Sequence, residues 1–314
     1  MKLHENKSDF KDAVTLTAQQ MNISEVFIEK DYWITLVLSY LAKSEFASQA
    51  VFKGGTSLSK GFGLIDRFSE DVDIAVIDDN KKSGSEIRNI IRTIEKEMTR
   101  DLRELTIDGV TSKGSKFRKS VFEYLSIDPD NKNNRLIVEV NSFANPFPFK
   151  RVSIKSFVFD FFTNTSNEKF IEQYDLQPFI LNVLNREQTM LEKTVSLIRF
   201  SFDENVFESI SKKIRHFYDL YFLMKDADCI SYMKSNDFKE EFNKILEHDR
   251  AVFDEPAGWQ EKSITESPLI TDFENLWKRL KDIYNTELTE LAYTAIPDER
   301  KVAENFNELI KLVK

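Results

Sequence analysis

The sequence predicts an α+β protein, with a mixed sheet and flanking helices in residues 1–165 and a mainly helical domain in residues 166–314. Strand-like segments are concentrated before Phe162, where they alternate with amphipathic segments. After Phe162 the apolar residues recur at helical spacing almost to the C-terminus. A chain of 314 residues is long enough for two ordinary domains. The change of pattern alone places the boundary between them, because no Gly/Pro/Ser-rich linker marks it.

Two helices are predicted at the start of the chain. Apolar residues at helical spacing predict one helix over residues 8–21 and another over residues 25–44, with Ser24 as the N-cap of the second. The apolar run at residues 33–42 is about half the length of a membrane span, so it predicts a buried helix.

Strand signals dominate the rest of the first half. Residues 71–77 are rich in β-branched side chains, and residues 85–105 form a polar helix with paired charges. A Lys-Gly-Ser-Lys turn joins residues 105–112 to residues 119–127, which predicts a hairpin. The other predicted strands are residues 50–53, which lead into a helix start or compact turn at 57–65, residues 135–143, and residues 152–162.

The second half carries the clearest amphipathic helices. One sizeable loop, residues 254–268, interrupts them. The predicted helices are residues 186–203, 207–226, 236–248, 272–292 and 299–313.

Composition limits the classes of protein that this chain can belong to. The single cysteine, Cys229, excludes a disulfide framework and a cysteine-based zinc site, and we expect a reduced, buried thiol. The polar N-terminal segment lacks the apolar core of a secretory signal, and no apolar run approaches a membrane span. We therefore expect a cytoplasmic protein.

The charge balance is acidic, with a formal net charge of −9, which argues against a non-specific nucleic-acid coat. Local basic clusters exist nonetheless, and their commonest role is a solvated loop or helix face. A basic surface around an acidic metal site is the other interpretation. The clusters are Lys113, Lys116, Arg118 and Lys119; Lys150, Arg151 and Lys155; and Lys212, Lys213 and Arg215.

Four of the eight glycines lie in one stretch, residues 51–76. Gly54 and Gly55 have no side chains, so the backbone can approach a ligand closely, and Thr56 and Ser57 follow near a helix start. Exposed N–H groups in such a loop suit phosphate oxygens. Lys60 and Arg67 lie in the same stretch and could bind phosphate charge.

Asp71 and Asp73 lie two residues apart in a predicted strand, so both carboxylates point to one face. Two adjacent like charges repel each other unless a cation or proton intervenes, and Mg²⁺ is the natural partner. The glycine loop and the aspartate pair together predict a phosphoryl- or nucleotidyl-transfer site. Each feature alone is common, and the Gly-Lys-Ser/Thr ending of a Walker A motif is missing.

A further strand, residues 135–143, places Glu139 and Asn141 on one face. A third carboxylate facing the aspartate pair would complete a metal cradle. The equal alternative is an edge-strand glutamate that faces water. If Glu139 is catalytic, its strand must lie beside the strand of Asp71.

The glycine and aspartate motif resembles the signature of the DNA polymerase β-like nucleotidyltransferase superfamily, although the spacing from Gly55 to Asp71 is longer than in its commonest members. More specifically, the chain is similar to the AbiEii/AbiGii toxin family of type IV toxin–antitoxin and phage abortive-infection systems. The likeness covers about residues 25–225. The motifs that carry it are "EKDYWITLVLSYL", "KGGTSLSKGFGLIDRFSEDVDI", "IVEVN", "VLNREQTMLEKTVSL" and "IRHFYDLYFL".

This resemblance implies a nucleotidyltransferase-like fold in residues 1–165 and a helical domain that contributes active-site residues. Lys193 would hold triphosphate oxygens, and Asp219 would support Lys193 or act as a base. Ser69 would lie in the site and could itself accept the transferred group. The implied catalytic residues are Asp71, Asp73, Lys193, Asp219, Ser69 and Glu139, with Asp71 and Asp73 binding the metal; the implied nucleotide-binding residues are Gly54, Gly55, Thr56, Ser57 and Arg67.

Simpler interpretations stand beside these. Lys193 fits a surface lysine paired with a neighbouring acid, and Asp219 fits an intrahelical pair with Arg215, four residues away. Ser69 could merely cap the entry to its strand. His216, one of three histidines, is interpreted as a structural or substrate-contacting side chain, because no spacing suits a histidine zinc site.

The function expected from the resemblance is that of a bacterial toxin. It would transfer a nucleotidyl group from a nucleoside triphosphate, with Mg²⁺, to RNA such as a tRNA 3′ end, and a cognate antitoxin would be its partner. Because the chain is acidic, a protein or small-molecule acceptor stays open. The alternatives are phosphoryl transfer from the same site, a nucleotide-binding regulator without turnover, and a plain scaffold.

Overall fold

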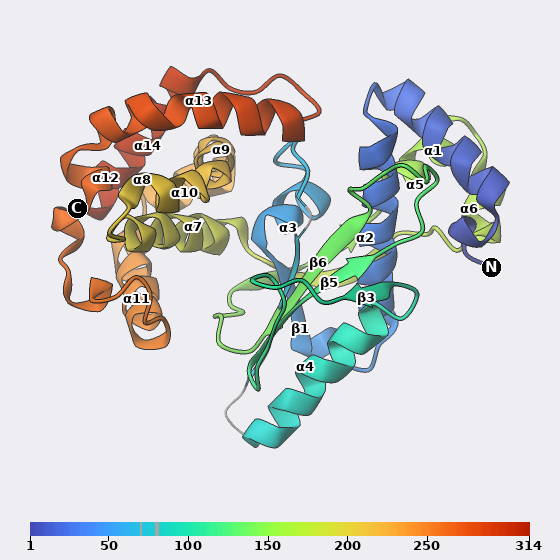
Figure 1. Ribbon diagram of the computed structural model, residues 1–314, viewed down its shortest axis with the longest axis horizontal. Coiled ribbons are helices and arrows are strands. Elements are labelled where there is room, and N and C mark those ends of the chain that lie inside the picture. Colours follow the sequence, from blue (N-terminus) through green and yellow to red (C-terminus); the bar gives the residue numbers. More distant parts are fainter. Residues whose placement is uncertain (70, 79–81) are drawn as a thin grey trace. The chain divides into compact units, whose positions relative to one another are not determined.

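The computed structural model describes residues 1–69, 71–78 and 82–314 (Figure 1). These residues form two compact units. The sheet unit comprises Met1–Gly63 and Phe68–Leu184, and the helical unit comprises Leu64–Arg67 and Asn185–Lys314. A mixed sheet with helices, followed by a helical part, confirms the predicted α+β class.

The sheet unit is built on an eight-stranded sheet of the described residues, in the order β3-β5-β6-β2-β1-β8-β7, with β4 paired to β5. β2 runs parallel to β6 and β1 parallel to β8, while the other pairs are antiparallel. The strands are β1 (Ala50–Lys53), β2 (Asp71–Val76), β3 (Arg103–Leu105), β4 (Ser112–Lys113), β5 (Phe117–Glu123), β6 (Arg135–Asn141), β7 (Phe149–Ile154) and β8 (Phe179–Leu184).

Helix α2 is the central helix of this unit, because α1, α4, α5 and β8 all pack against it. Its residues from Ile28 to Leu41 are buried on every side, which confirms the predicted buried helix. The helices of the unit are α1 (Lys7–Met21), α2 (Glu25–Lys43), α3 (Gly54–Lys60), α4 (Gly84–Met98), α5 (Phe157–Asn164) and α6 (Glu168–Gln173), with short 3₁₀ turns at Leu3–Glu5 and Ala47–Gln49.

A buried ion pair joins three of these helices. The Nζ atom of Lys60 in α3 lies 2.7 Å from Oδ1 of Asp31 in α2, and both side chains are less than a tenth exposed. The second oxygen, Oδ2, accepts a hydrogen bond from the backbone N–H of Phe157 at the start of α5. Lys60, which the sequence offered as a phosphate ligand, therefore fixes the helix that follows the glycine loop.

We expect Asp31→Asn to lower the free energy of unfolding by about 3 kcal/mol, because it leaves the Lys60 ammonium buried without its counter-charge. Urea unfolding of the purified protein measures this. The matched control is Asp12→Asn, which changes an exposed carboxylate of α1 and should cost less than about 0.5 kcal/mol. Equal losses from the two variants would contradict the structural role of the pair.

The helical unit has a core that contains a cluster of aromatic side chains. Phe217 of α9 contacts Phe273 and Trp277 of α13 and Phe306 of α14, with ring centroids 4.7–6.0 Å apart. Its helices are α7 (Arg186–Phe200), α8 (Val206–Ser211), α9 (Ile214–Leu223), α10 (Ala227–Met233), α11 (Asp237–Val252), α12 (Pro268–Thr271), α13 (Phe273–Leu291) and α14 (Glu299–Val313), with 3₁₀ turns at Trp259–Glu261 and Ile264–Glu266.

Several element predictions need correction. The helix predicted over 85–105 ends at Met98, and Arg103–Leu105 pairs with β5 instead. The strand predicted over 152–162 ends at Ile154, because Ser156 caps α5 by accepting a hydrogen bond from the N–H of Phe159. The helix predicted over 207–226 is two helices, α8 and α9, and β8 was missed. The hairpin is confirmed, although its first strand, β4, has two residues.

Cys229 is a buried free thiol, as predicted, and burial raises its pKa above the usual range. Among the described residues, no helix combines the length and apolarity needed to cross a bilayer.

Candidate active site

The glycine loop joins β1 directly to α3. Gly54 opens the helix with a φ of +76°, in the left-handed region that favours glycine. The Thr56 hydroxyl donates to the carbonyl oxygen of Asp71, and the Ser57 hydroxyl donates to the carbonyl of Gly54. Because both hydroxyl protons are engaged in these bonds, the donors of the loop that could bind an anion are the main-chain N–H groups of the first helical turn.

Gly54 also lies against the carboxylate of Asp73. A Cβ atom built on Gly54 would fall 2.1 Å from Oδ2 of Asp73, far inside van der Waals contact. A side chain at this position would therefore displace the carboxylate. Together with the hydrogen bond from Thr56 to β2, this contact couples the glycine loop to the aspartate strand.

The two aspartates alternate with buried apolar residues along β2, as predicted. Val72 and Ile74 are fully buried, while Asp71 and Asp73 are partly exposed on the other face. On the neighbouring strand β6, Glu139 pairs in register with Asp73. The strand of Glu139 therefore lies beside the strand of Asp71, which is the arrangement that a catalytic Glu139 requires.

Burial raises the pKa of the Glu139 carboxyl, and the nearby charge of Asp71 adds to this, while Lys119 and Lys53 oppose it. The amide of Asn141 donates to Oε1 of Glu139 at 3.3 Å. The Nζ atom of Lys119 lies 3.9 Å from Oε2. Both oxygens of Glu139 thus face groups of this chain.

The candidate site for a divalent cation is the pair Asp71 and Asp73, not a larger cluster of acidic residues. Among the described residues, no group of three Asp, Glu, His or Cys side chains is placed to hold a metal ion. Mg²⁺ is commonly held by one or two carboxylates together with substrate phosphates and water. Asp71 and Asp73 supply two carboxylates on one face, and the missing side chain of Gly54 leaves room for the carboxylate of Asp73.

In the helical unit, Asp219 is fully buried between two cations. Arg67 donates from Nε and Nη2 to the two carboxylate oxygens at 2.7 and 2.6 Å, and Lys193 Nζ lies 2.8 Å from Oδ2. Burial alone would raise the pKa of Asp219, but the charges and hydrogen bonds of Arg67 and Lys193 outweigh it and hold the pKa below its usual value. Asp219 is therefore ionised and fixed.

These contacts correct two of the simpler interpretations. Lys193 is a buried lysine, not a surface one, and Asp219 is its partner. Arg215 does not form the intrahelical pair, because its Nε atom lies 3.1 Å from Glu287 of α13. Arg67, predicted as a phosphate ligand, is buried with two of its nitrogens on Asp219.

Ser69 and His216 are two further residues that the sequence singled out. Ser69 is buried, and its Oγ accepts a hydrogen bond from the N–H of Asp71 at 3.4 Å, which is the contact of a strand-entry cap. In the helical unit, the Nδ1 atom of His216 is buried without a hydrogen-bond partner. Burial and the charges of Lys193, Lys213 and other cations lower the pKa of His216 well below its usual value, so its imidazole is neutral.

Sequence reasoning missed two relationships. Lys119, assigned to a solvated basic cluster, pairs in register with Glu139. Arg67 meets Asp219 across 152 positions of sequence. Residue parity places both Lys119 and Glu139 correctly on their strands, but the register between strands carries no signal in a single sequence.

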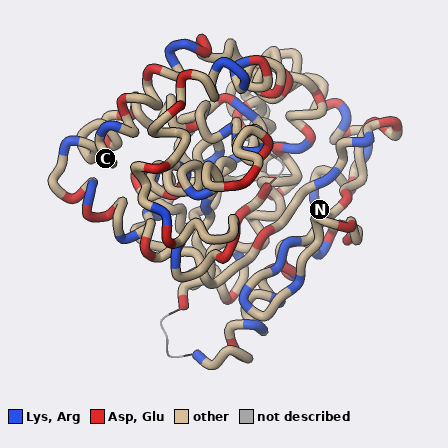
Figure 2. The backbone as a smooth tube through the Cα atoms, turned by 60° about the vertical axis from the view of Figure 1, so that its left-hand side comes forward, with Lys and Arg blue, Asp and Glu red and all other residues tan. Residues whose placement is uncertain are grey.

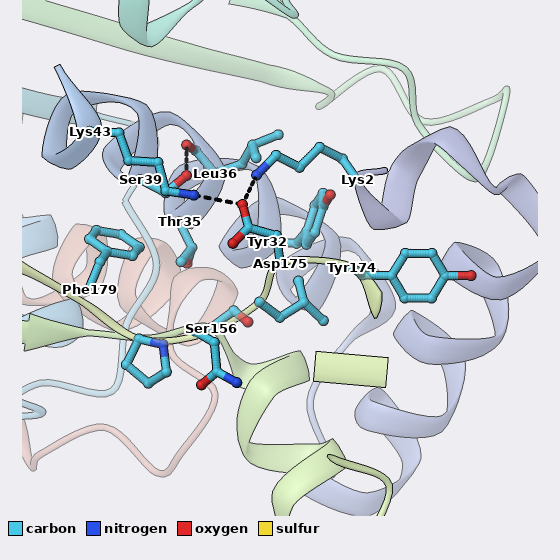
Figure 3. Close-up of a pocket in the computed structure, with 13 residues that line it drawn as sticks. Lys2, Tyr32, Thr35, Leu36, Ser39, Lys43, Ser156, Tyr174, Asp175 and Phe179 are labelled. Carbon is cyan, nitrogen blue, oxygen red and sulfur yellow. Dashed lines mark hydrogen bonds and ion pairs between the residues drawn. The ribbon is translucent and has the colours of Figure 1, made fainter. Parts of the chain in front are cut away.

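A cavity of about 110 Å³ lies elsewhere in the sheet unit (Figure 3). Its lining includes Tyr32, Leu36 and Phe179, and none of the predicted site residues. At its rim the ammonium groups of Lys2 and Lys43 converge on Asp175 at 2.7 and 2.6 Å.

Comparison with known proteins identifies the family. A solved structure, the nucleotidyltransferase toxin MenT4 from Mycobacterium tuberculosis H37Rv, is similar at 14% identity and a TM-score of 0.46, covering 96% of this chain and 99% of that one. A search of curated proteins finds no match. The model of the family described as nucleotidyl transferase AbiEii toxin, type IV toxin–antitoxin system, matches residues 36–305. The chain therefore belongs to the AbiEii family of nucleotidyltransferase toxins.

Proposed function

We propose that this nucleotidyltransferase toxin uses Mg²⁺ and a nucleoside triphosphate to add a nucleotidyl group to a hydroxyl of RNA, such as a tRNA 3′ end. The observation that carries the proposal is the coupling of the glycine loop to β2. Thr56 binds the backbone of Asp71, and Gly54 leaves room only for the carboxylate of Asp73. A phosphate-binding loop and two metal-binding carboxylates thus become one rigid arrangement.

Each residue has a defined task in this proposal. Asp71 and Asp73 hold the divalent ion, which neutralises the triphosphate when bound. The main-chain N–H groups from Gly54 to Ser57 bind phosphate oxygens. The acceptor hydroxyl gives up its proton to water and its oxygen bonds to the α-phosphorus, as the bond to the bridging oxygen breaks and pyrophosphate leaves.

Lys193 is the residue that we assign to the charge of the triphosphate. Lys193 contributes a fixed ammonium group, and Arg67 and Asp219 position it. Because both oxygens of Asp219 are engaged and its pKa is held low, Asp219 suits positioning better than proton abstraction. Glu139 is the third acidic residue of the site, and Ser69 is a second candidate acceptor.

The partner and acceptor follow from different considerations. Membership of a type IV toxin–antitoxin family implies an antitoxin and a nucleoside triphosphate substrate. We propose a cytoplasmic location, where both RNA and nucleotides are available. Acidic and basic residues are interspersed along the described backbone (Figure 2), so a local rather than a general basic surface would bind RNA.

Labelled nucleoside triphosphates test the proposal directly. Incubation of the purified protein with Mg²⁺, total tRNA and α-labelled triphosphate should label the tRNA, while γ-labelled triphosphate should not. Asp71→Ala should reduce the labelling by at least about 1,000-fold, because it removes a metal ligand and with it the neutralisation of the triphosphate. The control is Asp12→Ala, which changes an exposed carboxylate of α1.

The other outcomes distinguish the alternatives. Transfer of the γ-label would indicate a kinase. Magnesium-dependent nucleotide binding without any transfer, and toxicity retained in Asp71→Ala, would indicate a regulator. Labelled protein with unlabelled tRNA would move the acceptor to a side chain such as Ser69.

A further inference from the structure

Four charged residues form a row across the middle of the sheet. Lys53 of β1 pairs in register with Asp73 of β2, Asp73 with Glu139 of β6, and Glu139 with Lys119 of β5. Residues paired in register project from the same face of a sheet. The row therefore reads lysine, aspartate, glutamate, lysine, with the acids in the centre.

Each carboxylate oxygen of Glu139 faces a polar group of a neighbouring residue. Asn141, which is almost fully buried, donates to Oε1, and its own side-chain oxygen is fixed by the N–H of Ala144 at 3.1 Å. The ammonium of Lys119 faces Oε2 at 3.9 Å, close enough for charge attraction but longer than a hydrogen bond. Its N–H donors are therefore not satisfied by Glu139.

Charge balance opposes a second divalent ion at this place. Asp71, Asp73 and Glu139 carry three negative charges, and Lys53 and Lys119 already offset two of them. Enzymes with two metal ions hold the ions about 3.5–4 Å apart between shared carboxylates. A second ion next to Glu139 would lie beside the Lys119 ammonium and be repelled by it.

We propose that Lys119, held beside Glu139, takes the place of a second metal ion by supplying positive charge there, so that the site binds a single divalent cation. This rests on the proposed function, in which Asp71 and Asp73 bind Mg²⁺. Lys119 is then a positioning residue that excludes a second cation and leaves a compact, fixed charge near the reacting phosphate.

The number of bound ions tests this without an activity measurement. Mn²⁺ is titrated into the full-length protein without nucleotide, and free Mn²⁺ is followed by electron paramagnetic resonance. The wild type should bind one tight Mn²⁺ per chain, and Lys119→Met should bind two, because Glu139 becomes available as a ligand. The double variant Lys119→Met/Glu139→Gln should bind one again. The matched control is Lys116→Met, an exposed lysine of the same hairpin, which should bind one.

The outcomes separate this inference from the proposed function. Two ions in the wild type, or one ion in Lys119→Met, would overturn the role of Lys119 while leaving the aspartate site intact. No tight ion in the wild type would overturn the metal site itself, and the inference with it. Binding of one ion that is lost in Asp71→Asn, together with the gain in Lys119→Met, would support both.

Discussion

Gly54→Ala should reduce nucleotidyl transfer by about 100-fold or more, because it displaces the carboxylate of Asp73, which we propose as a metal ligand. The new Cβ would lie 2.1 Å from Oδ2 of Asp73, so the carboxylate must move by an ångström or more. A misplacement of about 1 Å in a catalytic arrangement can cost about 100-fold in rate. The variant should also lose about 1–2 kcal/mol of unfolding free energy, because the φ of +76° is strained for alanine.

Gly63→Ala separates the two effects. Gly63 also has a positive φ, +58°, but an added Cβ would meet nothing within 4 Å. It should lose a similar amount of stability and keep its transfer rate within about threefold, since the backbone cost is shared and the clash is not. Transfer assays and urea unfolding of both variants measure this. Equal loss of activity in the two, or full activity in Gly54→Ala, would contradict the coupling of the loop to Asp73.

Asp219→Asn should lower the unfolding free energy by about 3–5 kcal/mol, the typical cost of breaking a buried ion pair by removing one partner. The substitution leaves Arg67 and Lys193 buried without their shared counter-charge. Urea unfolding measures the loss, and transfer should fall as Lys193 loses its position. The control is Glu287→Gln, which breaks the half-exposed pair with Arg215 and should cost at most about 1 kcal/mol.

The same variant has a defined pH dependence. The pKa of Asp219 is lower in the folded protein than in the unfolded chain, so its contribution to stability is present above about pH 4. As the pH falls through the folded pKa, both states become protonated and the contribution is lost. The stability difference between wild type and Asp219→Asn should therefore narrow below about pH 4. A difference that grows in acid, or a cost no larger than that of Glu287→Gln, would contradict the buried pair.

Features decided by local pattern were predictable from the sequence. The strand at Asp71–Val76 and the parity of Asp71 and Asp73 follow from β-branched residues and from the two-residue period of a strand. The burial of α2 follows from its continuous apolar run. The family motifs then indicated Lys193 and Asp219, which the spacing of charges alone would have left as surface residues.

Features decided by distant contacts were not predictable. Residues 179–184 contain a short apolar run, and periodicity cannot distinguish a strand of this length from a helix segment. Their parallel pairing with β1 stabilises the strand. The pairing of Lys119 with Glu139 depends on the register between β5 and β6. The burial of Arg67 depends on Asp219, which lies far along the chain. None of these contacts leaves a mark in the local sequence.

The assignment of Leu64–Arg67 to the helical unit makes the two units inseparable by a single cut. The chain leaves the sheet unit after Gly63, contributes four residues to the helical unit, and returns at Phe68. A fragment starting at Asn185 would lack the arginine that binds Asp219, and also the short β-bridge from Arg67 to Ala292. During synthesis, Leu64–Arg67 can therefore reach its native contacts only after more than a hundred later residues have been made.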